Sequence, residues 1–239
     1  MDEQNKRSEG SEVRKTVTIL FADVIGSTEL GERLDPESLR QVMTRYYDAM
    51  RSALERHGGS VEKFIGDAVM AVFGVPMVHE DDALRAIRAA IDMRLALATL
   101  NVELERDWGA SIDIRTGLNT GEIVAGDHPS AGSSLVTGDA VNVAARLEQS
   151  AATGEILIGE DTYSLVKDAV HAEPTEPLLL RGKTERHNAY RLVQVLSDEP
   201  ISRRLESAMI GRDREMALLR QAMDRVAADH VCHLFTQPL

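Results

Sequence analysis

The apolar residues of this chain recur at helical spacing in two long stretches. Residues 35–57 form the first predicted helix, because Asp35 is a favoured N-cap, Pro36 fits the first helical position and Gly58-Gly59 ends the pattern. Residues 81–106 form the second, in which apolar positions return every three or four residues. Two shorter helices are predicted over residues 139–150 and 160–167.

Short apolar runs between the helices predict strands. Gly66-Asp67 separates two such runs and is typical of a tight hairpin turn. A second hairpin is predicted to turn around Asn119-Thr120-Gly121. Helices that alternate with hairpins favour an α/β (α+β) fold, in which helices flank a mixed sheet. The predicted strands are residues 16–22, 60–65, 68–73, 110–118, 121–126, 155–158, 178–180 and 188–195.

The polarity of the chain divides it into three parts. Residues 1–14 are polar and are predicted to be a disordered N-terminal segment. Residues 15–195 contain the predicted helices and strands, and are expected to form one domain. Residues 196–239 begin with a Ser-Asp-Glu-Pro linker and continue into an amphipathic helix, which predicts the truncated start of a following domain.

Composition narrows the function classes. The hydrophobic content of 43% supports a core, and the net charge of −12 argues against a nucleic-acid binder, which needs a basic face. The single cysteine, Cys232, excludes an intramolecular disulfide and favours a reducing compartment. The chain shows neither a signal peptide nor an apolar run of membrane-spanning length, so we expect a cytoplasmic protein without a membrane segment.

Two carboxylates stand where predicted strands end. Asp23 closes an apolar strand and precedes Gly26-Ser27-Thr28, a loop whose backbone N–H groups would attract phosphate at a helix start. Asp67 lies at a hairpin tip, four residues after Lys63. Together the carboxylates would suit Mg²⁺ and a polyphosphate. Each residue also has a simpler interpretation: Asp23 as a helix N-cap, Asp67 as turn chemistry and Lys63 as a solvated charge on an edge strand.

Further along the chain, polar residues suitable for phosphate and sugar occur on predicted strands, helices and loops. Asn142 and Arg146 are four apart and share a helix face, where they could hold a sugar oxygen and a phosphate charge. The alternative for Arg146 is a surface salt bridge. Arg115 on a strand could be a surface residue or a phosphate clamp. Arg181 and Lys183 share a tight loop, either as surface charges or as triphosphate contacts.

In their order and spacing, four segments resemble the catalytic domain of bacterial class III nucleotidyl (adenylate and guanylate) cyclases. They are Phe21–Thr28, Lys63–Asp67, Arg115–Gly121 and Gly138–Leu147. The resemblance covers about residues 15–195 and implies the class III cyclase fold, a ferredoxin-like βαββαβ core with a mixed sheet. Residues 210–215 resemble, more weakly, the opening of an ATPase module that follows some bacterial cyclase domains.

The resemblance implies a metal centre beside a phosphate cradle. Asp23 and Asp67 would bind two Mg²⁺ or Mn²⁺ ions per active site, with the Val24 carbonyl as a further ligand. The backbone amides that would cradle the phosphates are those of Ile25, Gly26, Ser27 and Thr28.

The resemblance also assigns the polar residues. Asn142 would orient the ribose, and Arg146 would stabilise the transition state at the α-phosphate. Arg115 and the loop that carries Arg181 and Lys183 would neutralise triphosphate charge, and which residue of that loop makes the contact stays open.

Base selection rests on two positions in the resemblance. Lys63 would donate to an adenine ring nitrogen. The family usually places Asp or Thr seven residues before Asn142, to accept from the adenine amino group, whereas this chain has Leu135, which cannot accept a hydrogen bond. Ser133, Ser134 and Thr137 are possible substitutes.

The implied function is that of an adenylate cyclase, a phosphorus–oxygen lyase that converts ATP to 3′,5′-cyclic AMP and pyrophosphate. In the family, the metal aspartates come from one chain and the lysine, asparagine and arginine from the other. Because this chain has both sets, a head-to-tail homodimer with two equivalent sites is expected. The alternatives are a weakly active, nucleotide-sensing dimerisation module, motivated by Leu135, and a cyclase with relaxed purine choice.

Overall fold

The computed structural model describes residues 13–126, 135–179 and 186–196. The predictions for residues 1–12 and 197–239, and those for Arg181 and Lys183, lie outside the described residues. Within these ranges, no helix combines the length and the apolar character that a membrane span requires.

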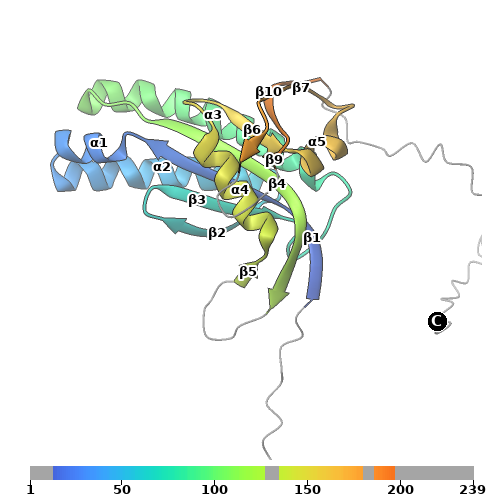
Figure 1. Cartoon of the computed structure of the whole chain (residues 1–239). Coiled ribbons are helices and arrows are strands. Elements are labelled where there is room, and N and C mark those ends of the chain that lie inside the picture. Colours follow the sequence, from blue (N-terminus) through green and yellow to red (C-terminus); the bar gives the residue numbers. More distant parts are fainter. Residues whose placement is uncertain (1–12, 127–134, 180–185, 197–239) are drawn as a thin grey trace, which may run out of the picture. The chain divides into compact units, whose positions relative to one another are not determined.

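The first half of the chain builds a βαββαβ unit (Figure 1). Its strands lie side by side in the order β2-β3-β1-β4, all antiparallel to their neighbours, which is the ferredoxin-like arrangement that the family resemblance implies. The elements are β1 (Val13–Ile25), α1 (Ser27–Arg33), α2 (Pro36–Arg56), β2 (Ser60–Ile65), β3 (Ala68–Phe73), α3 (Asp82–Trp108) and β4 (Asp113–Gly126).

The second half extends the same sheet beyond β4 in the order β6-β10-β7, with β5 paired to β4. The β4–β6 pairing is parallel, so the sheet is mixed, as predicted. Strands β8 and β9 form a separate two-stranded ladder. The elements are β5 (Leu135–Thr137), α4 (Asp139–Ser150), β6 (Ile156–Gly159), α5 (Glu160–Val166), β7 (Val170–Pro174), β8 (Leu178–Leu179), β9 (Arg186–His187) and β10 (Ala189–Val195).

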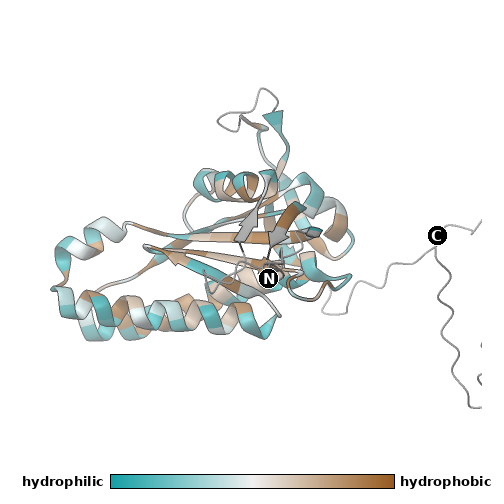
Figure 2. Ribbon diagram, turned by 90° about the horizontal axis from the view of Figure 1, so that it is seen from below, coloured by the Kyte–Doolittle hydropathy of each residue, from teal (hydrophilic) through white to brown (hydrophobic). Residues whose placement is uncertain are grey.

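Helices cover both faces of the sheet (Figure 2). Helices α2 and α3 enclose the larger core on one face, to which β1 contributes Leu20 and Ala22. Helix α4 covers the other face, where Val17 and Ile19 of β1 are buried. Successive strand residues point to opposite faces, so the parity of a position in β1 decides which helices it meets.

The predicted hairpin at Asn119-Thr120-Gly121 is wrong, because residues 113–126 form one continuous strand of 14 residues. Strand β1 pairs with β4 along this whole length, from Val13 opposite Ala125 to Ile25 opposite Asp113. The polar side chains that suggested a turn are buried and satisfied instead. Asn119 donates to the Ala140 carbonyl at 3.3 Å, and the Thr120 hydroxyl lies 2.9 and 3.0 Å from those of Thr18 and Thr162.

Other differences concern short strands and boundaries. Strands β5, β7 and β9 were not predicted. They have three, five and two residues, and segments this short show no clear alternation of apolar and polar positions. Strand β1 begins at Val13, which is earlier than the start predicted for the domain. The long helices α2 and α3 lie within two residues of their predicted bounds.

Helix α4 rests directly on the backbone of β4 at two glycines. A Cβ atom at Gly117 would lie 2.2 Å from the Glu148 backbone nitrogen and 2.5 Å from the Ala144 carbonyl oxygen. A Cβ atom at Gly121 would lie 2.8 Å from that of Ala140. Glycine at these positions therefore fixes how closely α4 approaches the sheet, and with it the positions of the polar residues on that helix.

Gly117→Ala is expected to destabilise the domain by about 1–3 kcal/mol or more, because the added methyl meets helix backbone that cannot move aside. Gly31→Ala is the matched control: a Cβ there meets only Leu39 at 3.6 Å on exposed α1, so the free energy of unfolding should stay within about 1 kcal/mol of wild type. Urea denaturation measures both changes. Equal unfolding midpoints for Gly117→Ala and wild type would contradict the close packing.

Candidate active site

The β1–β3 register brings the two predicted carboxylates together. Ala22 pairs with Val69, so continuing the register places Asp23 opposite Ala68 and beside Asp67. Neighbouring strands lie about 4.8 Å apart. Asp23 shares its parity with Val17 and Ile19 and therefore faces the side of the sheet that α4 covers. Both aspartates are partly buried.

Arg115 joins Asp23 to a buried acid on α4. Its Nη2 donates to Asp23 Oδ2 at 3.0 Å, and its Nε lies 2.6 Å from Glu148 Oε1, an ion pair that falls outside hydrogen-bond geometry. Gly26, and not Asp23, is the N-cap of α1, so the simpler interpretation of Asp23 as a helix cap is wrong. Asp23 forms an ion pair with Arg115 instead. The structure thus places Arg115 beside Asp23, the predicted metal ligand.

Glu148 was missed in the sequence analysis, although a signal exists. It lies four residues after Ala144 on the buried face of α4, and an acid on an apolar helix face needs a partner. Glu148 is only 5% exposed. Burial raises the pKa of its carboxyl; Arg115 opposes this rise, whereas Asp23 and Asp67 add to it.

Helix α2 contacts the tip of the β2–β3 hairpin. Gly66 adopts a positive φ of 63°, which the tight turn requires. The Tyr47 hydroxyl donates to the Gly66 carbonyl at 2.5 Å. The neighbouring Tyr46 is fully buried, and burial, followed by the charges of Asp23 and Asp67, raises the pKa of its hydroxyl. The sequence motifs predict no role for either tyrosine.

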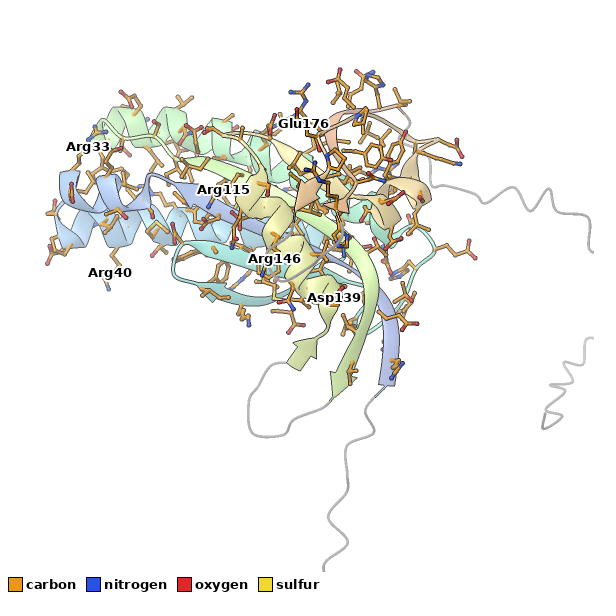
Figure 3. The ribbon with its side chains drawn as sticks, viewed as in Figure 1. Arg33, Arg40, Arg115, Asp139, Arg146 and Glu176 are labelled. Carbon is orange, nitrogen blue, oxygen red and sulfur yellow. The ribbon has the colours of Figure 1, made fainter. Side chains whose placement is uncertain are left out.

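Arg146 lies on the outer side of α4 (Figure 3), and Asn142, one helical turn earlier, shares its face. Asn142 is exposed, and Arg146 is partly exposed and makes no ion pair with the residues that the structure describes. The salt-bridge interpretation of Arg146 therefore finds no partner in this part of the chain. Lys63 is likewise exposed, on the edge strand β2. Among the described residues, none of these three side chains makes a hydrogen bond or ion pair with Asp23 or Asp67.

The predicted phosphate cradle begins at a glycine turn, and the predicted base position lies on a short strand. Gly26, at φ 74°, turns the chain into α1, and no side chain caps this helix, so the amides around Ser27 and Thr28 have no side-chain acceptor at the cap. Leu135 is the first residue of β5, and its backbone lies opposite Gly126. Its side chain lies outside the described part of the structure.

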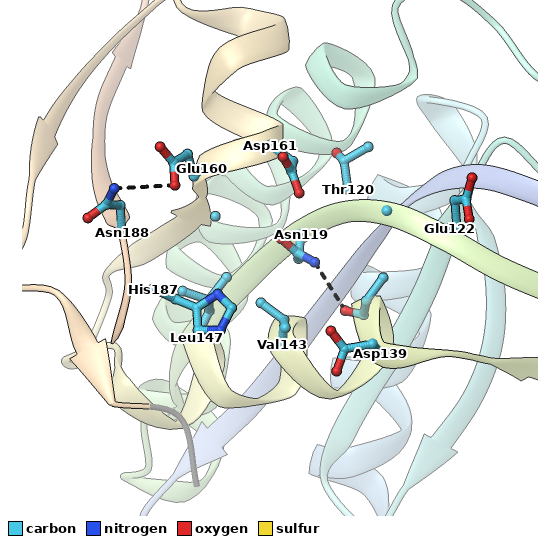
Figure 4. A pocket seen from close by; sticks show the side chains of 13 residues that line it. Asn119, Thr120, Glu122, Asp139, Val143, Leu147, Glu160, Asp161, His187 and Asn188 are labelled. Carbon is cyan, nitrogen blue, oxygen red and sulfur yellow. Dashed lines mark hydrogen bonds between the residues drawn. The ribbon is translucent and has the colours of Figure 1, made fainter. Parts of the chain in front are cut away.

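A separate cavity of about 310 Å³ lies on the inner side of α4 (Figure 4). Its lining includes the carboxylates Glu122, Asp139 and Asp161, and Glu160, which accepts a hydrogen bond from Asn188 at 3.2 Å. None of the residues predicted for the active site lines it. The cavity is therefore a second feature of the domain and does not define the predicted site.

Any metal at Asp23 and Asp67 would be held by two carboxylates and backbone oxygen. Among residues 13–126, 135–179 and 186–196, no group of three or more histidine, cysteine or acidic side chains is arranged as a metal site. Two carboxylates with carbonyl oxygen and water are nevertheless a donor set of the kind that Mg²⁺ and Mn²⁺ accept.

Comparison with known proteins decides the family. Residues 10–194 match the family model of the adenylate and guanylate cyclase catalytic domain. The chain belongs to this family. An adenylate cyclase of Mycobacterium tuberculosis is 30% identical over 184 residues, which are 77% of this chain and 41% of that protein. The cyclase domain thus spans less than half of that curated relative.

Two solved cyclase structures share the fold along nearly their whole length. The adenylyl cyclase CyaB of P. aeruginosa has a TM-score of 0.74 and 33% identity, over 79% of this chain and 99% of that chain. The guanylyl cyclase Cya2 has a TM-score of 0.74 and 31% identity, over 81% and 98%. The cyclase fold and membership of the cyclase catalytic-domain family are therefore established. The similar structures include an adenylyl cyclase and a guanylyl cyclase.

Glu148→Gln is expected to gain stability relative to wild type as pH rises. A folded-state pKa above the ordinary 4.5 means that the folded protein holds the Glu148 proton more tightly than the unfolded chain does. This carboxyl therefore stabilises the fold most at low pH, and the contribution is lost as pH rises through the folded-state pKa. Glutamine does not titrate, so urea denaturation of metal-free protein from about pH 4 to 8 should show the difference.

Glu173→Gln provides a control of opposite sign. A hydrogen bond from Arg191 at 2.5 Å lowers the pKa of Glu173, so the wild-type carboxylate gains stability relative to this variant as pH rises. Parallel pH curves for wild type and Glu148→Gln would contradict the raised pKa of Glu148.

Proposed function

We propose that this domain is an adenylate cyclase that converts ATP to 3′,5′-cyclic AMP and pyrophosphate in sites shared by two copies of the chain. The observation that carries the proposal is the separation of the predicted residues into two groups. Asp23 and Asp67 lie together at the strand ends, whereas Asn142 and Arg146 lie on the outer side of α4 without partners among the described residues. A head-to-tail homodimer completes both groups at each of two sites.

Asp23 and Asp67 are proposed to hold two Mg²⁺ or Mn²⁺ ions with the Val24 carbonyl. The oxygen donor set fits these ions, and the partial burial of both carboxylates favours binding over hydration. When bound, the metals supply positive charge that activates the ribose 3′-hydroxyl and stabilises the leaving pyrophosphate. Arg115 would share Asp23 with the metals and would keep its ion pair with Glu148, which retains it within the site.

The protein contributes positioning and charge. Backbone amides from Ile25 to Thr28 bind the phosphates, and Asn142 of the other copy orients the ribose. The 3′ oxygen then forms a bond to the α-phosphorus as the bond to pyrophosphate breaks, and the hydroxyl proton passes to solvent. Arg146 stabilises the charge that develops on the α-phosphate oxygens. No side-chain general base is required.

Adenine is proposed as the base because Lys63 is exposed and available to donate to it. Leu135 provides no acceptor side chain, so the polar residues around it, Ser133, Ser134 and Thr137, are the proposed substitutes. A cyclase with relaxed purine choice is the nearest alternative, since CyaB and Cya2 are similar to this chain to the same degree.

A weakly active nucleotide-sensing dimer is the second candidate function. The ion pair between Arg115 and Asp23 favours it, because the guanidinium competes with a metal for the same carboxylate. This candidate predicts nucleotide binding and dimerisation with little turnover. The cytoplasmic location and the ATPase-like continuation stay predictions.

Asp67→Asn is expected to lower cyclic AMP production by about a hundredfold or more while the dimer persists, because the amide removes a metal-binding charge. Activity is measured with ATP and with GTP, each with Mg²⁺ and with Mn²⁺. Asp168→Asn, at an exposed position on another part of the domain, is the matched control and should keep wild-type activity. Full activity of Asp67→Asn would contradict the metal role, and a wild-type preference for GTP would contradict the adenylate assignment.

Mixing two inactive variants tests the shared site. Asp67→Asn and Arg146→Ala chains damage different halves, so each mixed dimer keeps one complete site. Equal amounts should recover about a quarter of wild-type activity, because about half of the dimers are mixed and each has one of two sites. Asp67→Asn mixed with Asp23→Asn is the control and should recover nothing. Failure of the first mixture despite demonstrated mixed dimers would contradict the shared site.

A further inference from the structure

One hydrogen bond links the exposed hairpin tip to the core helix beneath it. The Tyr47 hydroxyl on α2 donates to the carbonyl oxygen of Gly66 at 2.5 Å. The ring that carries this hydroxyl is fixed on two sides, with its centroid 4.6 Å from the Phe64 ring and 5.5 Å from the Tyr46 ring. Tyr46 is itself fully buried. The donor ring therefore packs against the core.

The acceptor lies in a turn with little other support. Gly66 has no side chain, and the space in which its Cβ would lie has no atom within 4 Å. The preceding residue, Ile65, is 51% exposed. Glycine at a positive φ loses much backbone entropy when it is fixed. The hydroxyl of Tyr47 thus restrains a peptide group that side-chain packing leaves unrestrained.

The restrained peptide group is the one that leads into Asp67. The Gly66 carbonyl belongs to the peptide bond between Gly66 and Asp67, so fixing its orientation also fixes the direction in which the Asp67 backbone leaves the turn. Burial raises the pKa of the Tyr47 hydroxyl, and the charge of Asp67 adds to this rise, which indicates that the two residues are close. A metal carboxylate must be placed within a narrow range to bind well.

We propose that Tyr47 is a positioning residue for the metal carboxylate Asp67 and acts through the Gly66 carbonyl. The inference rests on the proposed metal role of Asp67 and extends it to a residue on the opposite side of the sheet. The aromatic ring serves the core, whereas the hydroxyl serves the metal site. The two contributions are therefore separable by removing the hydroxyl alone.

Tyr47→Phe tests the inference by retaining the ring. Mn²⁺ binding to the full chain is measured by calorimetry without nucleotide, and cyclase activity is measured as a function of Mn²⁺. Loss of one hydrogen bond should weaken Mn²⁺ binding by about threefold to tenfold. The concentration for half-maximal activity should rise in parallel, while activity at saturating Mn²⁺ stays within about twofold of wild type.

Tyr190→Phe is the matched control, because it removes a hydroxyl from a ring that stacks on Tyr163 at 3.9 Å on strand β10. It should leave Mn²⁺ binding unchanged. Unchanged Mn²⁺ affinity in Tyr47→Phe, beside a wild type that binds Mn²⁺, would overturn the positioning role alone. Lower activity at saturating Mn²⁺ with an unchanged half-maximal concentration would indicate a merely structural role and would also overturn it. A wild type that binds no Mn²⁺ would overturn the proposed metal site and this inference together.

Discussion

The close approach of α4 to β4 is the constraint on which the site depends. With no side chain at Gly117, the helix backbone rests on the strand backbone, and the rotation of the helix is thereby fixed. On the face of α4 that packs on the sheet, Glu148 then forms an ion pair with Arg115. The other face leaves Asn142 and Arg146 on the outside. A small shift of the helix would disturb both arrangements at once, because interiors packed at this density do not deform smoothly.

Sequence reasoning predicted the helices and the hairpin whose signals lie within one segment of the chain. The bounds of α2 and α3 followed from apolar spacing and from Asp35, which does cap its helix by accepting from the Ser38 amide at 2.9 Å. The β2–β3 hairpin followed from Gly66-Asp67. These signals are local, and the structure kept them because local preference and tertiary packing agree there.

The failures occurred where tertiary contacts determine the outcome. Asn119-Thr120-Gly121 has turn composition, yet β1 provides a paired partner along the whole segment and buried hydroxyl and carbonyl groups satisfy its side chains. The contacts of Glu148 and Tyr47 depend on residues 33 and 19 positions away, respectively Arg115 and Gly66. Spacing within a segment contains no information about such contacts. The aspartate pair was suggested by two local contexts, and the four motifs considered together favoured this interpretation over the simpler ones.

The ion pair between Arg115 and Asp23 also bears on how the domain folds. Carboxylates gathered for metal binding repel one another, and some small metal-binding domains unfold when the metal is removed. Here a cation from the same chain already neutralises one of them at 3.0 Å, and Glu148 anchors that cation from the other side. The polypeptide therefore carries its own counter-ion at this carboxylate. The charge at Asp23 is thus balanced by the fold itself, through two strands and a helix that hold Arg115 between two acids.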